Sequence, residues 1–163
     1  MSDGMEEALA IIKRWEGCEL TAYPDPGTGG HPWTIGYGAT GPGIRKGVVW
    51  TQAEADARVA EDVRRFHRGV LASLKRQANR HQMAAMTSLA FNIGLGAFTK
   101  STLLRRFNEG KFQAAAAEFD RWVRAGGRVM PGLVGRRRDE RALFETPDFS
   151  LVRSGVTSTE RML

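Results

Sequence analysis

A single long amphipathic pattern between Thr51 and Leu74 limits the folds open to this chain. Thr51 followed by Glu54 matches a capping box, in which each side chain accepts a hydrogen bond from the other residue's backbone N–H. The pattern predicts one helix of about 24 residues, roughly 36 Å long. We interpret this helix as a spine that joins two parts of the fold. Its apolar face carries Ala55, Val59, Val63, Phe66, Val70 and Leu74. Its basic residues are expected to face solvent: Arg58, Arg64, Arg65, Arg68, Lys75 and Arg76.

Short β-like runs precede this helix, and further helical patterns follow it. Residues 19–24 and 33–38 flank a Pro- and Gly-rich stretch and predict a hairpin with a wide loop. A helix over 3–16, ended by Gly17, is expected before the hairpin. Later helices are expected over 79–94, from Thr99 or Ser101 to near Gly110, over 112–123 and over 135–144. The sequence therefore predicts an α+β fold, mainly α, in which a small N-terminal β-hairpin lobe is joined by a long helix to a helical lobe.

The domain organisation follows from the length of the chain and from this element order. A chain of 163 residues suits one domain, which we predict over residues 1–149. Its first lobe is expected at about 15–50, its connecting helix at about 51–75 and its helical lobe at about 79–149. Residues 150–163, in which Ser, Thr and Gly are prominent, are expected to be a loosely held C-terminal tail. The core of the helical lobe is expected to contain Met86, Leu89, Phe91, Leu103, Leu104, Phe107, Phe119 and Trp122.

Three side chains near the predicted hairpin carry chemistry. Glu16 ends the first helical pattern, Asp25 stands between two prolines, and Thr34 opens the second β-like run. Glycoside hydrolysis needs such a set, because one carboxylic acid protonates the leaving oxygen while another group activates or positions water on the opposite face. We therefore expect Glu16, Asp25 and Thr34 to converge on one cleft.

The residues around this set resemble a known family, the phage-type lysozymes of glycoside hydrolase family 24. The resemblance rests on the order Glu16-Gly17, Asp25 and Thr34-Ile35-Gly36-Tyr37-Gly38, on Ala90-Phe91-Asn92-Ile93-Gly94, and on the run from Gly132 to Leu143 with its Arg136, Arg137, Arg138, Glu140 and Arg141. It spans roughly residues 6 to 149. The loop between Asp25 and Thr34, which contains His31, is longer than the family pattern, and we expect His31 to be solvated.

The resemblance implies a lysozyme-like fold and a muramidase activity. Such an enzyme, an endolysin, hydrolyses the β-1,4 bond between N-acetylmuramic acid and N-acetylglucosamine in bacterial peptidoglycan, with inversion, and lyses the host cell. Glu16 would be the proton donor. Asp25 would stabilise the developing oxocarbenium charge and help orient the attacking water, which Thr34 would also hold. Tyr23, Trp33, Tyr37 and Asn92 are the expected substrate-binding residues. No metal site and no cofactor are expected.

Two alternatives within this fold stay open on the sequence. A lytic transglycosylase would cleave the same bond with one Glu and without water. A non-catalytic peptidoglycan-binding module would keep the fold alone. The formal charge of +6 and the pI of about 10.1 favour an anionic partner, which peptidoglycan satisfies. A nucleic-acid partner is not expected, because the basic residues are spread over several helices without a recognition element.

The sequence also predicts where the protein is found. It has no run of about eighteen apolar residues and no basic-then-apolar leader, so neither membrane insertion nor a signal peptide is expected. Cys18 is the only cysteine, so no intramolecular disulfide can form. A monomer is expected in the host bacterial cytoplasm until release, which a separate membrane-permeabilising partner of the holin type would provide. It would then act on the periplasmic cell wall.

Overall fold

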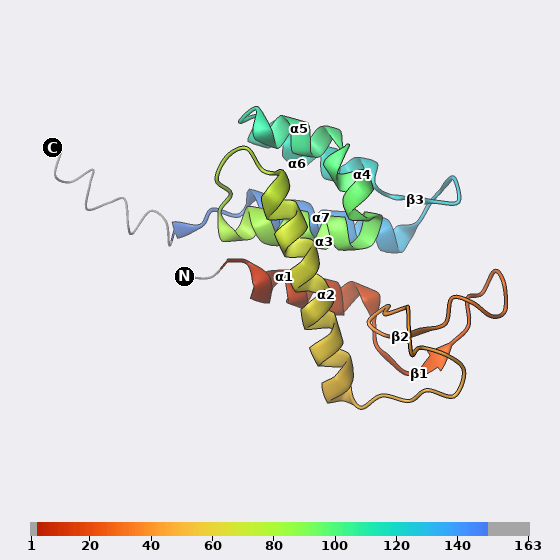
Figure 1. The fold of residues 1–163 in the computed structure, drawn as a ribbon. Coiled ribbons are helices and arrows are strands. Elements are labelled where there is room, and N and C mark those ends of the chain that lie inside the picture. The colour runs from red at the N-terminus through yellow and green to blue at the C-terminus, as the bar shows by residue number, and fades with distance from the viewer. Residues whose placement is uncertain (1–2, 150–163) are drawn as a thin grey trace, which may run out of the picture.

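The computed structural model describes residues 3–149, and the predicted tail at 150–163 lies outside them. Figure 1 shows a small β-containing region at one end of α2 and a group of helices around the other end. The elements, in chain order, are α1 (Met5–Glu16), β1 (Glu19–Tyr23), β2 (Thr34–Gly36), α2 (Gln52–Ser73), α3 (Arg80–Ile93), α4 (Leu95–Thr99), α5 (Thr102–Asn108), α6 (Phe112–Glu118), the 3₁₀ turn η1 (Phe119–Arg121), β3 (Arg124–Ala125), β4 (Arg128–Val129) and α7 (Pro131–Glu145).

The long helix α2 forms where the amphipathic pattern predicts it. Thr51 caps its N-terminus: the Thr51 hydroxyl accepts from the Glu54 N–H at 3.1 Å, and the Glu54 carboxylate accepts from the Thr51 N–H at 3.3 Å. This reciprocal pair satisfies two donors that the first turn of a helix leaves without a partner. The buried stripe of α2 consists of Ala55, Val59, Val63, His67 and Val70.

The predicted hairpin forms from β1 and β2, which pair antiparallel. Glu19 lies opposite Gly36 and Tyr23 lies opposite Thr34. Gly36 has a φ of 64°, and a Cβ at this position would lie 3.1 Å from the Trp50 ring. The chain therefore needs glycine at the point where it leaves β2 and passes under the indole. A small core lies beneath the hairpin and contains Ala22, Ile35, Ala39 and Ile44.

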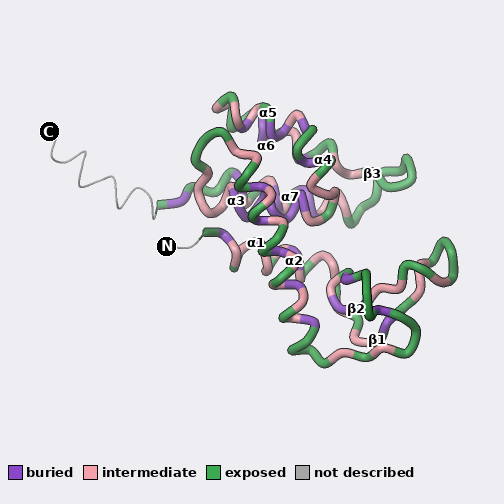
Figure 2. The backbone as a smooth tube through the Cα atoms, in the orientation of Figure 1, coloured by how far each residue is buried: buried purple, intermediate pink, exposed green. Residues whose placement is uncertain are grey.

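The helical lobe is organised around α3, which packs against α1, α2 and α7. Figure 2 shows the buried residues concentrated along α3 and α7. Of the predicted core residues, Phe91 and Trp122 are only partly buried and pack at the edge of the core. The other six are fully inside: Met86, Leu89, Leu103, Leu104, Phe107 and Phe119.

Three details of this lobe differ from the sequence-based expectation. The short helix α4 fills the stretch after Gly94 where only a break was expected. The helix expected over 112–123 ends at Glu118 and is followed by η1, and Gly126 and Gly127 form the turn between β3 and β4 with φ values of 57° and 78°. Positive φ at both central residues is typical of a tight hairpin turn. Finally, α7 begins at Pro131 rather than Gly135, because proline suits the first position of a helix, where its missing N–H costs nothing.

Among the described residues, every helix is too short or too polar to span a membrane.

Candidate active site

Glu16 is the last residue of α1, and Gly17, with a φ of 67°, turns the chain away immediately afterwards. The Glu16 side chain is 23% exposed. It opens onto a hollow of about 350 Å³ between the end of α1 and the hairpin. A carboxyl at a helix end beside an open hollow can reach a ligand without any movement of the backbone. The hollow is lined by Glu16, Gly17, Cys18, Glu19, Tyr23 and Gly36.

Arg136 holds the Glu16 carboxylate from behind. The Arg136 Nη1 donates to Glu16 Oε1 at 2.7 Å, although 120 residues separate them in the chain. Arg136 is only 3% exposed, so the ion pair connects a buried guanidinium to a carboxylate at the surface of the hollow. Arg136 belongs to the run from Gly132 to Leu143 that resembles the family, but no role was expected for it. Its spacing of four residues from Glu140, which places both side chains on one face of a helix, is the sequence feature that could have indicated their pairing.

Tyr23 and Thr34 lie across from one another on the two strands of the hairpin. The pKa of the Tyr23 hydroxyl is raised, first because the side chain is partly buried. The negative charges of Glu16 and Glu19 raise it further, and the Thr34 side chain lowers it. Tyr23 lines the hollow beside Glu16. Thr34 is the cross-strand partner of Tyr23 but is not part of that lining.

Asp25 follows β1 and is fixed by its own loop. Its Oδ2 accepts from the backbone N–H groups of Gly27 and Thr28, each at 3.1 Å. Its own backbone N–H donates to the Gly30 carbonyl at 3.0 Å. This is the turn chemistry of an aspartate that stabilises a tight loop. The carboxylate therefore has a fixed position two residues after Tyr23, and it is not part of the lining of the hollow at Glu16.

The other predicted substrate-binding residues lie in three different settings. Trp33 is half-buried and packs on the small core beneath the hairpin. The Tyr37 hydroxyl accepts from Gln52 Nε2 at 3.1 Å and donates to Asp56 Oδ1 at 3.4 Å, which ties it to the first turn of α2. Asn92 is exposed near the end of α3. Of the four, Tyr23 alone contributes to the lining of the hollow that Glu16 enters.

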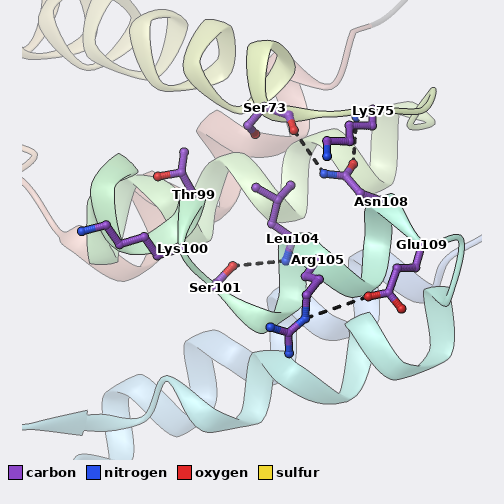
Figure 3. A pocket seen from close by; sticks show the side chains of 9 residues that line it. All are labelled: Ser73, Lys75, Thr99, Lys100, Ser101, Leu104, Arg105, Asn108 and Glu109. Carbon is purple, nitrogen blue, oxygen red and sulfur yellow. Dashed lines mark hydrogen bonds and ion pairs between the residues drawn. The ribbon is translucent and has the colours of Figure 1, made fainter.

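A second hollow, of about 490 Å³, lies on the helical lobe and is shown in Figure 3. Its rim carries Lys75, Lys100 and Arg105 and one acidic residue, Glu109. The Lys111 ammonium, hydrogen-bonded to Glu109, is the first cause that lowers the pKa of that carboxyl. This hollow contains none of the predicted site residues. Within residues 3–149, no cluster of His, Cys, Asp and Glu side chains is arranged to bind a metal ion.

The fold and the sequence both have close relatives. The family model "Phage lysozyme" matches residues 13–140. An endolysin of Bacillus phage PZA is 41% identical over 95% of this chain, which spans 60% of that protein. An endolysin of Acyrthosiphon pisum secondary endosymbiont phage 1 is also 41% identical, over 86% of this chain and 97% of its own length. Among solved structures, the muramidase domain of SpmX from Asticaccaulis excentricus has a TM-score of 0.78 and 35% identity, and the alignment covers 86% of this chain and 96% of that one.

These matches confirm the predicted resemblance and the predicted lysozyme-like fold class. The family model covers most of the chain, including Glu16, Asp25, Thr34 and Arg136. This chain therefore belongs to the phage lysozyme family.

Proposed function

We propose that this chain is a muramidase that hydrolyses the β-1,4 bond between N-acetylmuramic acid and N-acetylglucosamine in bacterial peptidoglycan, and that it lyses a phage's host. The observation that carries the proposal is the setting of Glu16. In a chain 41% identical to two proteins named endolysins, this carboxyl opens onto a hollow beside Tyr23 and is anchored by Arg136. A substrate-facing carboxyl with a fixed position is what proton donation to a leaving group requires.

Glu16 is assigned as the general acid. Its proton passes to the glycosidic oxygen as the bond between that oxygen and the anomeric carbon breaks, and Glu16 is left as a carboxylate. Arg136, 2.7 Å from Glu16 Oε1, then lies next to the new negative charge.

Asp25 and Thr34 are assigned to the attacking water. The water adds to the anomeric carbon from the face opposite the leaving group, so the configuration at that carbon is inverted. The proton of the water passes to the Asp25 carboxylate. Both backbone N–H groups that fix Asp25 use Oδ2, so Oδ1 is the oxygen that we assign to the water. Thr34 lies opposite Tyr23 on the hairpin and would hold the water from that side.

A turbidity assay on outer-membrane-permeabilised bacteria tests the proposal. Wild type should clear the suspension, and Glu16→Gln should not, because an amide cannot donate the proton. Glu145→Gln is the matched control, since Glu145 is exposed at the end of α7 and does not line the hollow. Full clearing by Glu16→Gln would refute the assignment of the acid.

The products separate this proposal from its alternatives. Nuclear magnetic resonance of the freshly cleaved glycan should show the α-anomer, and a retained β-anomer would refute inversion. An anhydro sugar end would identify a lytic transglycosylase, which should also be indifferent to Thr34→Ala. Binding to walls without any clearing would identify a non-catalytic module. Family membership favours the hydrolase over both.

The finer points of organisation and location belong to the same proposal. Residues 1–149 would form one domain, and the protein would act as a monomer. It would remain in the host cytoplasm until a membrane-permeabilising partner of the holin type releases it to the wall. Sedimentation of the purified protein tests whether it is a monomer. Expression in bacteria with and without such a partner, followed by fractionation and turbidity, tests whether release to the wall needs the partner.

A further inference from the structure

Glu140 is a fully buried carboxylate to which the mechanism above gives no part. It lies in α7 with an exposure of 0%. Its Oε2 accepts hydrogen bonds from the Ser88 hydroxyl in α3, from Arg136 Nε at 3.3 Å and from Arg137 Nη2 at 3.2 Å. Its Oε1 forms an ion pair with Arg137 Nε at 2.6 Å. A charge is expensive to bury unless it is paired and hydrogen-bonded, and Glu140 meets both conditions.

The same contacts fix Arg136 completely. Each of the three guanidinium nitrogens has its own partner: Nε donates to Glu140, Nη2 donates to the Ser88 carbonyl at 3.2 Å, and Nη1 donates to Glu16. Because the guanidinium is planar, two of these bonds determine where the third points. The position of Nη1, and hence of the Glu16 carboxyl that it holds, is set by Glu140 and Ser88.

We propose that Glu140 is a positioning residue that, through the Arg136 guanidinium, fixes the orientation of the Glu16 carboxyl at the hollow. The inference rests on the proposed function, in which Glu16 is the general acid. Glu140 does not touch the substrate. It acts because α3 and α7 pack together, as Figure 1 shows, and bring Ser88 and Arg136 to the same carboxylate.

Charge explains why a carboxylate is needed rather than any buried polar group. Glu140 places two acceptor oxygens between the guanidinium groups of Arg136 and Arg137, which are 3% and 1% exposed. Without a carboxylate between them, these two buried like charges would repel each other. The repulsion would displace the Arg136 guanidinium that holds Glu16.

The test compares Glu140→Gln with Glu140→Asp in the full-length protein. Glu140→Gln keeps the length of the side chain and removes its charge. We expect its turnover number at neutral pH to fall by about tenfold to a hundredfold, with little change in KM, as a small misplacement of a catalytic group predicts. Glu140→Asp keeps the carboxylate that pairs with Arg136, so it should lose less turnover than Glu140→Gln does.

Two further variants separate positioning from stability. Glu145→Gln removes the partner of Arg141 Nε, at 3.0 Å, from an exposed i,i+4 pair on the same helix. It should leave the turnover number and KM unchanged. Ser88→Ala keeps every charge and removes one donor to Glu140, so its turnover number should fall severalfold with little change in KM. It also keeps the inference testable if Glu140→Gln does not fold.

The outcomes are distinct for each claim. The inference is overturned if folded Glu140→Gln or folded Ser88→Ala has the wild-type turnover number. An inactive wild-type protein would instead refute the proposed function, on which all of these comparisons depend. A lower melting temperature alone, with unchanged kinetics, would show that Glu140 has only a structural role.

Discussion

Substitution of Arg136 by methionine tests how much the buried charged cluster stabilises the fold. Arg136 is 3% exposed, and methionine has a similar length but no donors. The change removes the bonds to Glu140, to the Ser88 carbonyl and to Glu16. Glu140 keeps Arg137 as a partner, while the Ser88 carbonyl loses its side-chain donor. Water can reach the Glu16 side chain, which is 23% exposed, so the buried contacts decide the cost.

Breaking a buried ion pair by removing one partner costs about 3–5 kcal/mol, and we expect a loss in that range for Arg136→Met. In a domain of this size, each kcal/mol corresponds to about 2–4 °C, so the melting temperature should fall by roughly 6–20 °C. Urea unfolding followed by circular dichroism measures the free energy directly. The midpoint should fall at a constant slope, because the surface exposed on unfolding is unchanged.

Arg141→Met is the control for this measurement. Arg141 lies on the same helix, its side chain is 36% exposed, and it pairs with Glu145 and Asp120 at the surface. Exposed pairs contribute about 0–1 kcal/mol, so this variant should be nearly neutral. In the double variant Arg136→Met/Glu140→Leu, the loss of unfolding free energy should be smaller than the sum of the two single losses. Each single variant leaves one charge of this buried pair without its partner, whereas the double variant removes both charges. An Arg136→Met variant as stable as Arg141→Met, or losses that simply add, would refute the reasoning.

Three further predictions concern other parts of the molecule. Gly135→Ala should lower the free energy of unfolding by about 1–3 kcal/mol, because its Cβ would lie 2.5 Å from the Trp15 ring. Gly132→Ala, whose Cβ would meet open space, should not lower it, and calorimetry compares the two variants. The pKa of Asp56 is lowered, first by the hydrogen bond that Gln52 donates to its carboxylate. The ionised carboxylate therefore stabilises the fold fully above pH 3.8, the ordinary pKa of the group, and this contribution is lost as the pH falls through the lowered pKa. The stability advantage of wild type over Asp56→Asn should therefore shrink below pH 3.8, and a constant difference across pH would contradict this. Reversing the charge of Lys75 and Lys100 at the second hollow should weaken adsorption to isolated cell walls and reduce its salt dependence, both measured by co-sedimentation. Adsorption equal to wild type would show that these lysines do not contact the wall.

Local signals allowed the sequence to predict most of the elements that carry the site. The capping box at Thr51 and Glu54 and the stop at Gly17 depend on neighbours within a few residues, and both occur in the structure. The end of α1 at Glu16 could therefore be predicted. The turn at Gly126 and Gly127 could not, because two glycines after a helical pattern are equally typical of a helix stop and of a hairpin.

The part of the site that the sequence did not predict depends on tertiary packing. Arg136 and Glu140 are spaced as an ordinary exposed i,i+4 pair, and only the packing of α7 on α3 buries them. Asp25, between two prolines, could be predicted as a rigid turn residue, and its two backbone N–H donors agree with that. Its role toward water depends on a substrate that no pattern in the sequence describes.

The bond between Glu16 and Arg136 makes the order of synthesis matter. The first helix leaves the ribosome early, but the guanidinium that orients its last residue is translated 120 residues later. A nascent or truncated chain that lacks α7 has the acidic residue without its anchor. The ion pair between Glu16 and Arg136 can therefore form only after α7 has emerged from the ribosome.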